Sequence, residues 1–312
     1  MNIFPYDSKI DFLRYRHVAL VIAVLMIIGS MVLLGVRGLN YALDFTGGTV
    51  AELTFEHPAD LDDLRDRLDA GGYPGAVVQA FGSEFDVMVR LQSSEGQDNI
   101  TQTGDAVRTV LSSNENPATL VRSDFVGPQV GKELAQNGIL AAIFVMLGFV
   151  IYISIRFEWK FAIAAILSTS FTLIITTALF AVTWREFDLT VMAGVLSVMG
   201  YAINDTIVVF DRVRENFRSL QKVDTREVLN RSVNQTLSRT VITSFVALLT
   251  VIALYIYGGD SLEGMAESQI CGIIVGTLSS IFVACPLLLL LGTTKMDMMP
   301  KVRDDADLAR RP

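Results

Sequence analysis

The chain has 312 residues, of which 51% are hydrophobic and 19% charged, and its mean hydropathy of +0.46 is too high for an ordinary soluble domain. Polar stretches interrupt the apolar ones, so the composition predicts a polytopic membrane protein and excludes a single span. The net charge of −8 at pH 7 argues against a nucleic-acid partner. Because the two histidines and two cysteines form no group with metal-ligand spacing, we expect no metal, no cofactor and no soluble-type enzyme.

The first apolar run covers residues 18–36 and follows a mostly polar segment, residues 1–17, that contains Lys9, Arg14 and Arg16. A run of this length can cross a bilayer as a helix. A cleaved signal peptide would have a shorter apolar core and a small-residue cleavage site. We therefore predict a retained first span after a cytoplasmic N-terminus.

Residues 37–137 form the only long hydrophilic region, and short alternating or amphipathic segments replace the continuous apolar pattern there. Alternation predicts strands, and apolar residues at helical spacing predict helices. The expected order is βαββαβ, which is typical of a ferredoxin-like α+β sandwich. The predicted elements are strands at residues 49–55, 76–81, 85–91 and 118–126, and helices at residues 61–68 and 100–111.

Two turn-rich junctions frame this domain. The entry run, residues 44–49, contains Asp44 and the pair Gly47 and Gly48, and the exit run contains Gly127 and Pro128. Glycine allows positive φ and close backbone approach, and a Gly-Pro step fixes a bend. We interpret both junctions as rigid connections between a strand and a span, because a P-loop would need a following lysine and a helix start.

Five further apolar runs lie within residues 138–292, which brings the prediction to six transmembrane helices. The expected spans are residues 138–155, 161–182, 189–210, 241–257 and 270–291. Between the fourth and fifth, residues 211–239 form a charged cytoplasmic loop with an amphipathic helical pattern. Residues 293–312 form a polar cytoplasmic tail. Cys271 and Cys285 both fall in the last span, where we expect packing roles.

Lys and Arg residues fix the expected orientation. With both termini inside, the inner segments carry 17 of the 25 basic residues, as the positive-inside rule requires. This orientation places residues 37–137 on the outer side of the membrane. That domain also contains 16 of the 33 acidic residues, so its negative charge accounts for the negative total and needs no explanation beyond solubility.

The fourth predicted span contains a carboxylate, Asp205, between apolar residues on both sides. An ionisable group at hydrocarbon depth costs a few kcal/mol and usually faces a bundle interior on a proton or ion path. Ser197, Tyr201 and Asp205 recur at fourfold spacing with Asn204 beside them, so they predict one polar helical stripe. The alternative is that Asp205 only reaches the inner interface or supports local packing.

The fifth predicted span begins with a matching stripe that includes Arg239 and Thr243. We predict that Arg239 is the partner of Asp205, because a nearby guanidinium favours the charged carboxylate and separation of the two favours the protonated form. Such an alternation would be a proton relay. The alternative for Arg239 is that its side chain snorkels to the inner interface.

Small and hydroxylated residues mark the third and sixth predicted spans. Ser168, Thr172 and their neighbours are expected mainly to hydrogen-bond across helices. Gly272, Gly276 and Ser280 recur at fourfold spacing, a small-residue face that predicts close helix packing rather than chemistry.

Four motifs stand out together: Asp-Phe-Thr-Gly-Gly-Thr at residues 44–49, Phe-Val-Gly-Pro at 125–128, Arg-Phe-Glu-Trp at 156–159, and residues 200–217 with Arg239-Thr240. With them the chain resembles, over nearly its whole length, the SecD/SecF family of protein-export membrane proteins, within the resistance-nodulation-division superfamily. The resemblance implies a place in the bacterial cytoplasmic membrane and a SecD-like six-span partner. It also implies use of the proton gradient to assist export of unfolded polypeptide through SecYEG, with YajC and YidC as further partners. Asp205 and Arg239 then match the family's intramembrane acid and arginine.

One departure from the family pattern affects the proton path. Many relatives have a His-Asp pair in the third span, where this chain has Phe171 and Thr172.

Two other functions remain open at this stage. A self-contained proton-coupled small-molecule exporter would have to pair with itself, and the single modest outer domain argues against it. A non-transporting scaffold would tolerate neutralisation of Asp205.

Overall fold

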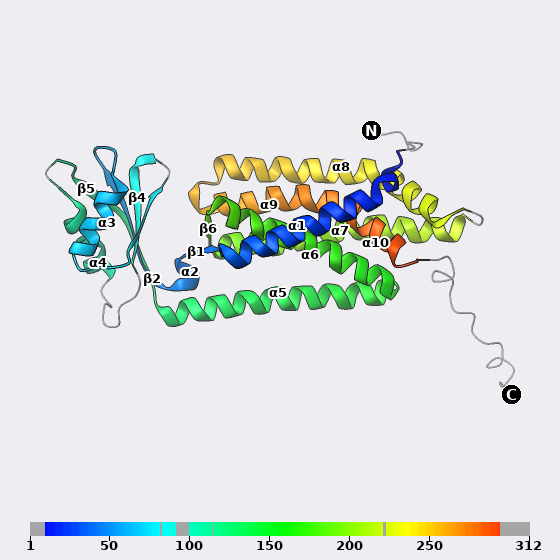
Figure 1. The fold of residues 1–312 in the computed structure, drawn as a ribbon, viewed down its shortest axis with the longest axis horizontal. Helices are drawn as coiled ribbons and strands as arrows, with labels where there is room; N and C mark the ends of the chain where they lie inside the picture. Colours follow the sequence, from blue (N-terminus) through cyan, green and yellow to red (C-terminus); the bar gives the residue numbers. More distant parts are fainter. Residues whose placement is uncertain (1–9, 82, 92–99, 114, 221–222, 294–312) are drawn as a thin grey trace, which may run out of the picture. The chain divides into compact units, whose positions relative to one another are not determined.

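The computed structural model describes residues 10–81, 83–91, 100–113, 115–220 and 223–293, and it divides into two units (Figure 1). One unit is Tyr41–Ala141, and the other joins Met1–Asn40 to Ala142–Pro312. Most of the predicted cytoplasmic N-terminus and nearly all of the predicted tail lie outside the described residues.

The unit Tyr41–Ala141 contains one four-stranded sheet with strand order β3-β4-β2-β5, and all neighbouring strands are antiparallel. Alternate residues of β2, among them Ala51, Leu53 and Phe55, are buried, as the sequence alternation predicts. Leu68 of α3 and Leu111 of α4 pack against them in a single core. The elements are β2 (Gly48–Phe55), α3 (Leu61–Ala70), β3 (Val77–Phe81), β4 (Ser83–Leu91), α4 (Ile100–Leu111) and β5 (Ala118–Val126), preceded by the short α2 (Leu43–Thr46).

Six helical stretches in the described chain are long and apolar enough to cross a membrane, which makes this a multi-pass membrane protein. The sixth stretch, Ser261–Leu290, is interrupted by the π-helical segment η2. The helices are α1 (Arg16–Val36), α5 (Pro128–Arg156), α6 (Trp159–Thr183), α7 (Leu189–Ser219), α8 (Thr225–Tyr257), α9 (Asp260–Ser279), η2 (Ser280–Ala284) and α10 (Cys285–Leu290), with the 3-10 turn η1 (Phe12–Tyr15) before α1 and the short strands β1 (Asn40–Tyr41) and β6 (Glu186–Phe187).

Helices α7 and α8 extend well beyond the apolar runs that predicted them. The charged segment of residues 211–239, for which the sequence predicts an amphipathic helical pattern, is helical at both ends, because α7 continues to Ser219 and α8 begins at Thr225. Inside that segment Asn216 Nδ2 donates to Ser232 Oγ at 2.8 Å and to Gln235 Oε1 at 2.9 Å. These hydrogen bonds let the polar ends of the two helices pack together.

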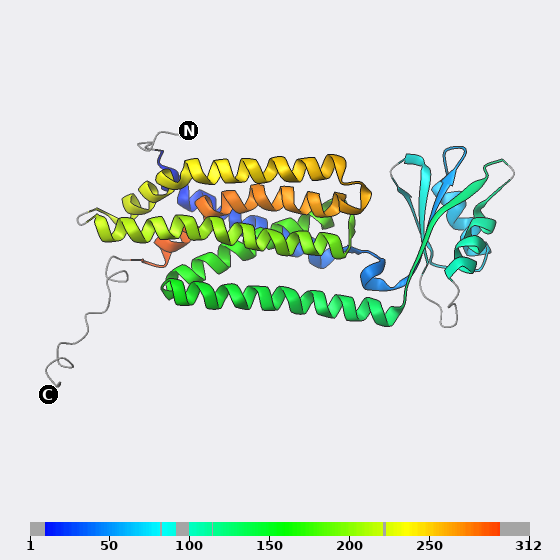
Figure 2. The same ribbon diagram turned by 180° about the vertical axis from the view of Figure 1, so that it is seen from behind.

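Helix α9 lies beside α6, α7 and α8 in both views of the bundle (Figures 1 and 2). Its close approach to α7 depends on glycine, because a Cβ built on Gly272 would lie 2.3 Å from Val198 Cγ1. A Cβ on Gly276 would lie 3.2 Å from Ala202 Cβ. The close packing predicted for these two glycines is confirmed.

Candidate functional site

Asp205 lies on α7 in the interior of the bundle, with 5% of its surface exposed. The helix that carries it begins at an N-cap, where Asp188 Oδ1 accepts the backbone N–H of Val191 at 2.7 Å. Its neighbours Ala202, Ile203 and Val209 are buried apolar residues. The alternative in which Asp205 only reaches the interface does not fit this burial.

The hydrogen bond to the Asp205 carboxylate comes from Ser280, whose Oγ lies 3.0 Å from Oδ2. Ser280 is fully buried and is the first residue of η2. The same Oγ lies 2.9 Å from the carbonyl oxygen of Thr277. A serine hydroxyl has one proton, so Ser280 donates to one of these two acceptors at a time.

The sequence predicts close packing for Ser280 but not its hydrogen bond to Asp205. The fourfold spacing that it shares with Gly272 and Gly276 hides the hydroxyl within a small-residue pattern. The sequence contains no pattern that predicts the π-helical turn beginning at Ser280. Turns of this kind are frequent at functional sites.

Thr240 of α8 is the second hydroxyl beside Asp205 and is 1% exposed. Its Oγ1 is buried and has no hydrogen-bond partner among the residues that the structure describes. A buried hydroxyl without a partner costs free energy, of the order of 1–3 kcal/mol. Thr240 Oγ1 thus lies near the carboxylate but makes no hydrogen bond of normal geometry among the described residues.

Arg239, the predicted partner of Asp205, is exposed and makes no ion pair with it in this structure. The guanidinium is close enough to act on Asp205 only through its charge. Thr243 is also exposed, and its hydroxyl donates within α8 to the carbonyl of Arg239 or Thr240, each at 3.0 Å. The buried hydroxyl of Ser280, rather than the guanidinium, therefore contacts the carboxylate here.

The predicted polar stripe of α7 divides between two environments. Tyr201 points inward with Asp205, and its hydroxyl donates to Ser244 Oγ of α8 at 2.7 Å. Ser244 Oγ is in turn 2.7 Å from Thr277 Oγ1 of α9, so three helices are linked. Ser197 and Asn204 are instead exposed at the depth of the membrane.

Further hydroxyls lie between α6 and α9. Ser279 Oγ is 3.0 Å from Thr172 Oγ1 and 3.2 Å from Ser168 Oγ, and all three residues are buried. The predicted hydrogen bonding across helices is confirmed. At the positions of the family's His-Asp pair, Thr172 belongs to this cluster, whereas Phe171 packs with Ala23 and Val283.

Arg185 connects two acidic residues at the end of the bundle where α9 begins. Its Nη1 lies 2.8 Å from Glu263 Oε1 and 2.7 Å from Glu267 Oε1. The hydrogen bond to Glu263 raises the pKa of Arg185 above its usual value, so this guanidinium remains charged. The sequence did not predict this group because its members come from separate segments.

The glycines of the entry junction are conformationally required. Gly47 and Gly48 have φ angles of 66° and 125°, and a Cβ on Gly48 would lie 2.3 Å from the carbonyl oxygen of Leu91. Asp44 lies in α2, and Pro128 is the first residue of α5 after Gly127. No group of three potential metal ligands occurs among the described residues.

Comparison with known proteins matches this chain to two family models. Residues 106–294 match "Protein export membrane protein SecD/SecF, C-terminal", and residues 32–59 match "SecD/SecF GG Motif". The chain is 42% identical over 291 residues to the protein translocase subunit SecF of Escherichia coli O157:H7, covering 93% of this chain and 90% of that one. It is 44% identical over 303 residues to SecF of Pseudomonas aeruginosa, covering 96% and 97%.

Two solved structures have the same fold. The crystal structure of SecDF from Thermus thermophilus, described as a translocon-associated membrane protein, is 33% identical with a TM-score of 0.82. The match covers 93% of this chain and 40% of that chain. A crystal structure of SecDF in a super-membrane-facing form gives a TM-score of 0.68 at the same identity, covering 92% and 39%.

Proposed function

Because this chain belongs to the SecD/SecF family of protein export membrane proteins, we propose that it uses the proton motive force, together with a SecD-like partner, to assist export through SecYEG. It acts as a transport subunit rather than an enzyme, with protons as the coupling ion and no cofactor. The observation that carries this proposal is the buried carboxylate of Asp205 with its hydroxyl contacts.

Ser280 gives the relay two hydrogen-bonding arrangements. When Asp205 is charged, it accepts the Ser280 O–H at 3.0 Å. When Asp205 takes up a proton, it donates that proton to Ser280 Oγ, and Ser280 turns its own O–H to the Thr277 carbonyl at 2.9 Å. Protonation therefore moves the Ser280 hydrogen bond from the carboxylate to the Thr277 carbonyl next to η2. Because the carboxylate is buried, loss of its charge also changes the free energy of the packed helices by an amount large enough to shift a conformational equilibrium.

Arg239 acts in a second conformation of the cycle. In this structure Arg239 makes no ion pair with Asp205. A helix movement that brings the guanidinium to the carboxylate stabilises the charged form of Asp205, so that Asp205 releases its proton. Thr240, with its buried hydroxyl, would donate to the carboxylate in that state. Thr172 cannot replace the acid of the third span because its hydroxyl does not titrate, so the partner supplies any further carboxylates.

A partner is required by the polar groups that the bundle leaves uncovered. Ser197 and Asn204 of α7 and Arg239 and Thr243 of α8 are exposed in helices that cross the membrane. Polar groups facing lipid are costly, so we infer that the SecD-like protein covers them. YajC, YidC and SecYEG would contact the resulting complex, and the cargo is unfolded polypeptide.

The bias of basic residues supports both termini inside the cytoplasmic membrane and the sheet-containing unit outside. We further assign that unit to the ferredoxin-like α+β class on the basis of its strand order and the helices of its core. A cysteine replacing Glu56 should react with an impermeant maleimide added outside intact cells, and one replacing Ser219 should not. The reverse labelling would overturn the orientation.

The test of the function is export measured in vesicles that contain the full complex, with and without a proton gradient. Asp205→Asn keeps size and much hydrogen bonding but removes titration, so it should abolish the gradient-dependent part of export while the complex still assembles. Asp211→Asn is the matched control, since that carboxylate lies at the inner end of α7, half exposed, and pairs with Arg156 at 2.8 Å.

The outcomes separate the competing functions. Normal export by Asp205→Asn across a measured gradient would leave a scaffold as the better account. An active complex that lacks any second six-span chain would favour a self-contained small-molecule exporter. Within the relay, Arg239→Lys should retain more gradient-dependent export than Arg239→Ala, because a point charge survives although the planar fork is lost.

A further inference from the structure

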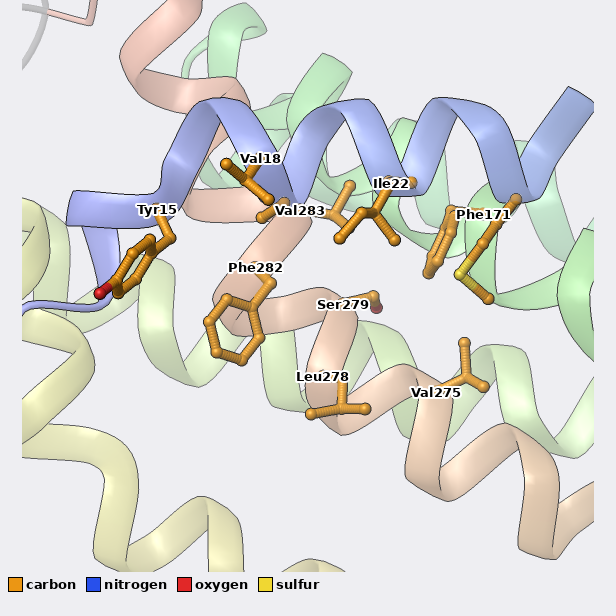
Figure 3. A pocket seen from close by; sticks show the side chains of 12 residues that line it. Tyr15, Val18, Ile22, Phe171, Val275, Leu278, Ser279, Phe282 and Val283 are labelled. Atoms are coloured by element: carbon orange, nitrogen blue, oxygen red, sulfur yellow. The ribbon is translucent and has the colours of Figure 1, made fainter.

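An apolar groove of about 400 Å³ lies between α1 and the α9 to η2 segment, outside the region of Asp205 (Figure 3). Val18 and Ile22 of α1 form one wall, and Leu278 and Phe282 form the opposite wall. Phe171 of α6 closes one end. We name this site the α1 groove.

Only two of the twelve lining side chains are polar, and the hydroxyl of one of them, Ser279, is already hydrogen-bonded within the bundle. Ser279 Oγ lies 2.9 Å from the carbonyl oxygen of Gly276 and is engaged by Thr172 at 3.0 Å. The other polar residue, Tyr15, lies at the far end from Phe171 (Figure 3). Apolar cavities without free polar partners hold no ordered water, so the wall fits hydrocarbon.

Two arginines, Arg14 and Arg16, flank Tyr15, the residue at one end of the α1 groove. Arg14 Cζ is 5.7 Å from the centroid of the Tyr15 ring, and Arg16 Nε donates to His17 Nε2 at 3.3 Å. Within the described part of the chain neither arginine has an acidic partner. Two unpaired guanidinium groups at the membrane edge of an apolar groove are the complement of an anionic phospholipid headgroup.

The surface around the α1 groove is of the kind that faces lipid. Val21 and Leu25 of α1 are apolar, 58% and 62% exposed, and do not line the groove. The exposed surfaces of α7 and α8 differ, since they contain Asn204, Arg239 and Thr243. A protein partner is needed where polar groups must be covered, whereas lipid suffices along α1.

We propose that the α1 groove binds one acyl chain of an anionic phospholipid whose phosphate pairs with Arg14 and Arg16. The inference is independent of proton coupling through Asp205. The acyl chain fills the space between α1 and the π-helical segment, and the two arginines select the headgroup charge.

The test is native mass spectrometry of the full chain, with any partner that co-purifies, titrated with phosphatidylglycerol and phosphatidylethanolamine of identical acyl chains. The wild type should retain one phosphatidylglycerol in preference to phosphatidylethanolamine by roughly tenfold or more, as expected for two arginines near the phosphate. Arg14→Gln with Arg16→Gln should remove the preference but keep weak binding of both lipids. Ala19→Trp fills the groove and should abolish retention of either lipid.

Val21→Trp is the matched control, because Val21 is on the same helix but does not line the groove, and it should bind lipid as the wild type does. The thermal stability of each variant is measured as well, and only variants as stable as the wild type are compared, so that misfolding is distinguished from lost binding. Equal retention of the two lipids by the wild type, or unchanged retention in Ala19→Trp, would overturn the proposal. A photoreactive side chain at position 22 that cross-links a partner polypeptide instead of lipid would overturn it too.

Discussion

The six membrane helices fall into two groups that differ in burial. In the apolar stretches of α6, α7 and the α9 to α10 segment, 50%, 50% and 56% of residues are buried within this chain. In those of α1, α5 and α8 the shares are 11%, 11% and 17%. Both groups are strongly apolar, so composition alone does not separate them.

The difference shows that helices of similar apolar composition occupy two different environments in this bundle. The inner helices carry the buried polar residues Asp205, Ser280 and Thr172, which only a protein interior can satisfy. The outer helices present apolar side chains to their surroundings, as at Phe144, which is 69% exposed. The buried carboxylate therefore lies in the inner group, and the outer helices leave most of their apolar surface to be covered by lipid or by other chains.

The comparison predicts its largest difference in stability between truncation of a buried phenylalanine in the inner group and truncation of an exposed one in the outer group. Phe161 of α6 is fully buried, and its ring centroid is 5.1 Å from that of Phe210. Phe161→Ala should lower the free energy of unfolding by about 3–5 kcal/mol, because it leaves a cavity. Phe144→Ala should change it by about 0.5 kcal/mol or less, because its side chain does not pack inside this chain. Unfolding of the purified chain in detergent measures both, and equal losses would break the comparison.

A smaller effect is expected from enlarging glycine. Gly272→Leu places a side chain against Val198 and should cost about 1–3 kcal/mol through overpacking. A Cβ added to Gly148 of α5 would have no atom within 4 Å, so Gly148→Leu should be tolerated. The midpoint of thermal unfolding distinguishes the two variants. A Gly272→Leu chain as stable as the wild type would mean that α7 and α9 do not pack as described.

The smallest of these effects is expected from removing single hydroxyls. Ser280→Ala removes the donor to Asp205 and should cost about 1 kcal/mol of stability. It should also reduce, without abolishing, the gradient-dependent part of export. Thr250→Ala on α8 is the control, because that exposed hydroxyl bonds only to the carbonyl of Val246 at 3.1 Å. Equal export by the two variants would remove Ser280 from the relay.

Regular patterns in the sequence predicted the fold well where one face of an element is buried. The helix Ile100–Leu111 and the strand Ala118–Val126 were predicted to the residue, since their apolar positions follow the helical or alternating period. Six spans were predicted because apolar runs of sufficient length are unambiguous. The ends of α7 and α8 do not follow from apolarity, because both helices extend into the charged segment, where Asn216 and Ser232 hydrogen-bond to each other.

The candidate site was predicted only in part. Asp205 could be found because an isolated carboxylate in an apolar run is rare. Ser280 could not, because its role depends on a π-helical turn and on packing between segments separated by 75 residues. The fourfold spacing of Ser197, Tyr201 and Asp205 overstated their shared face, since each step of four residues rotates about 40° around the helix. Ser197 consequently lies outside and Asp205 inside.

The central claim is that Asp205 is the group that takes up and releases a proton inside the bundle. Infrared difference spectroscopy of the reconstituted complex after a pH jump reports protonated carboxyl groups by their carbonyl stretch. The account predicts a band that is lost in Asp205→Asn, retained in Asp211→Asn, and shifted in frequency in Ser280→Ala because a hydrogen bond to the carboxyl group is removed. A carboxyl band that is identical in wild type and Asp205→Asn would contradict the claim.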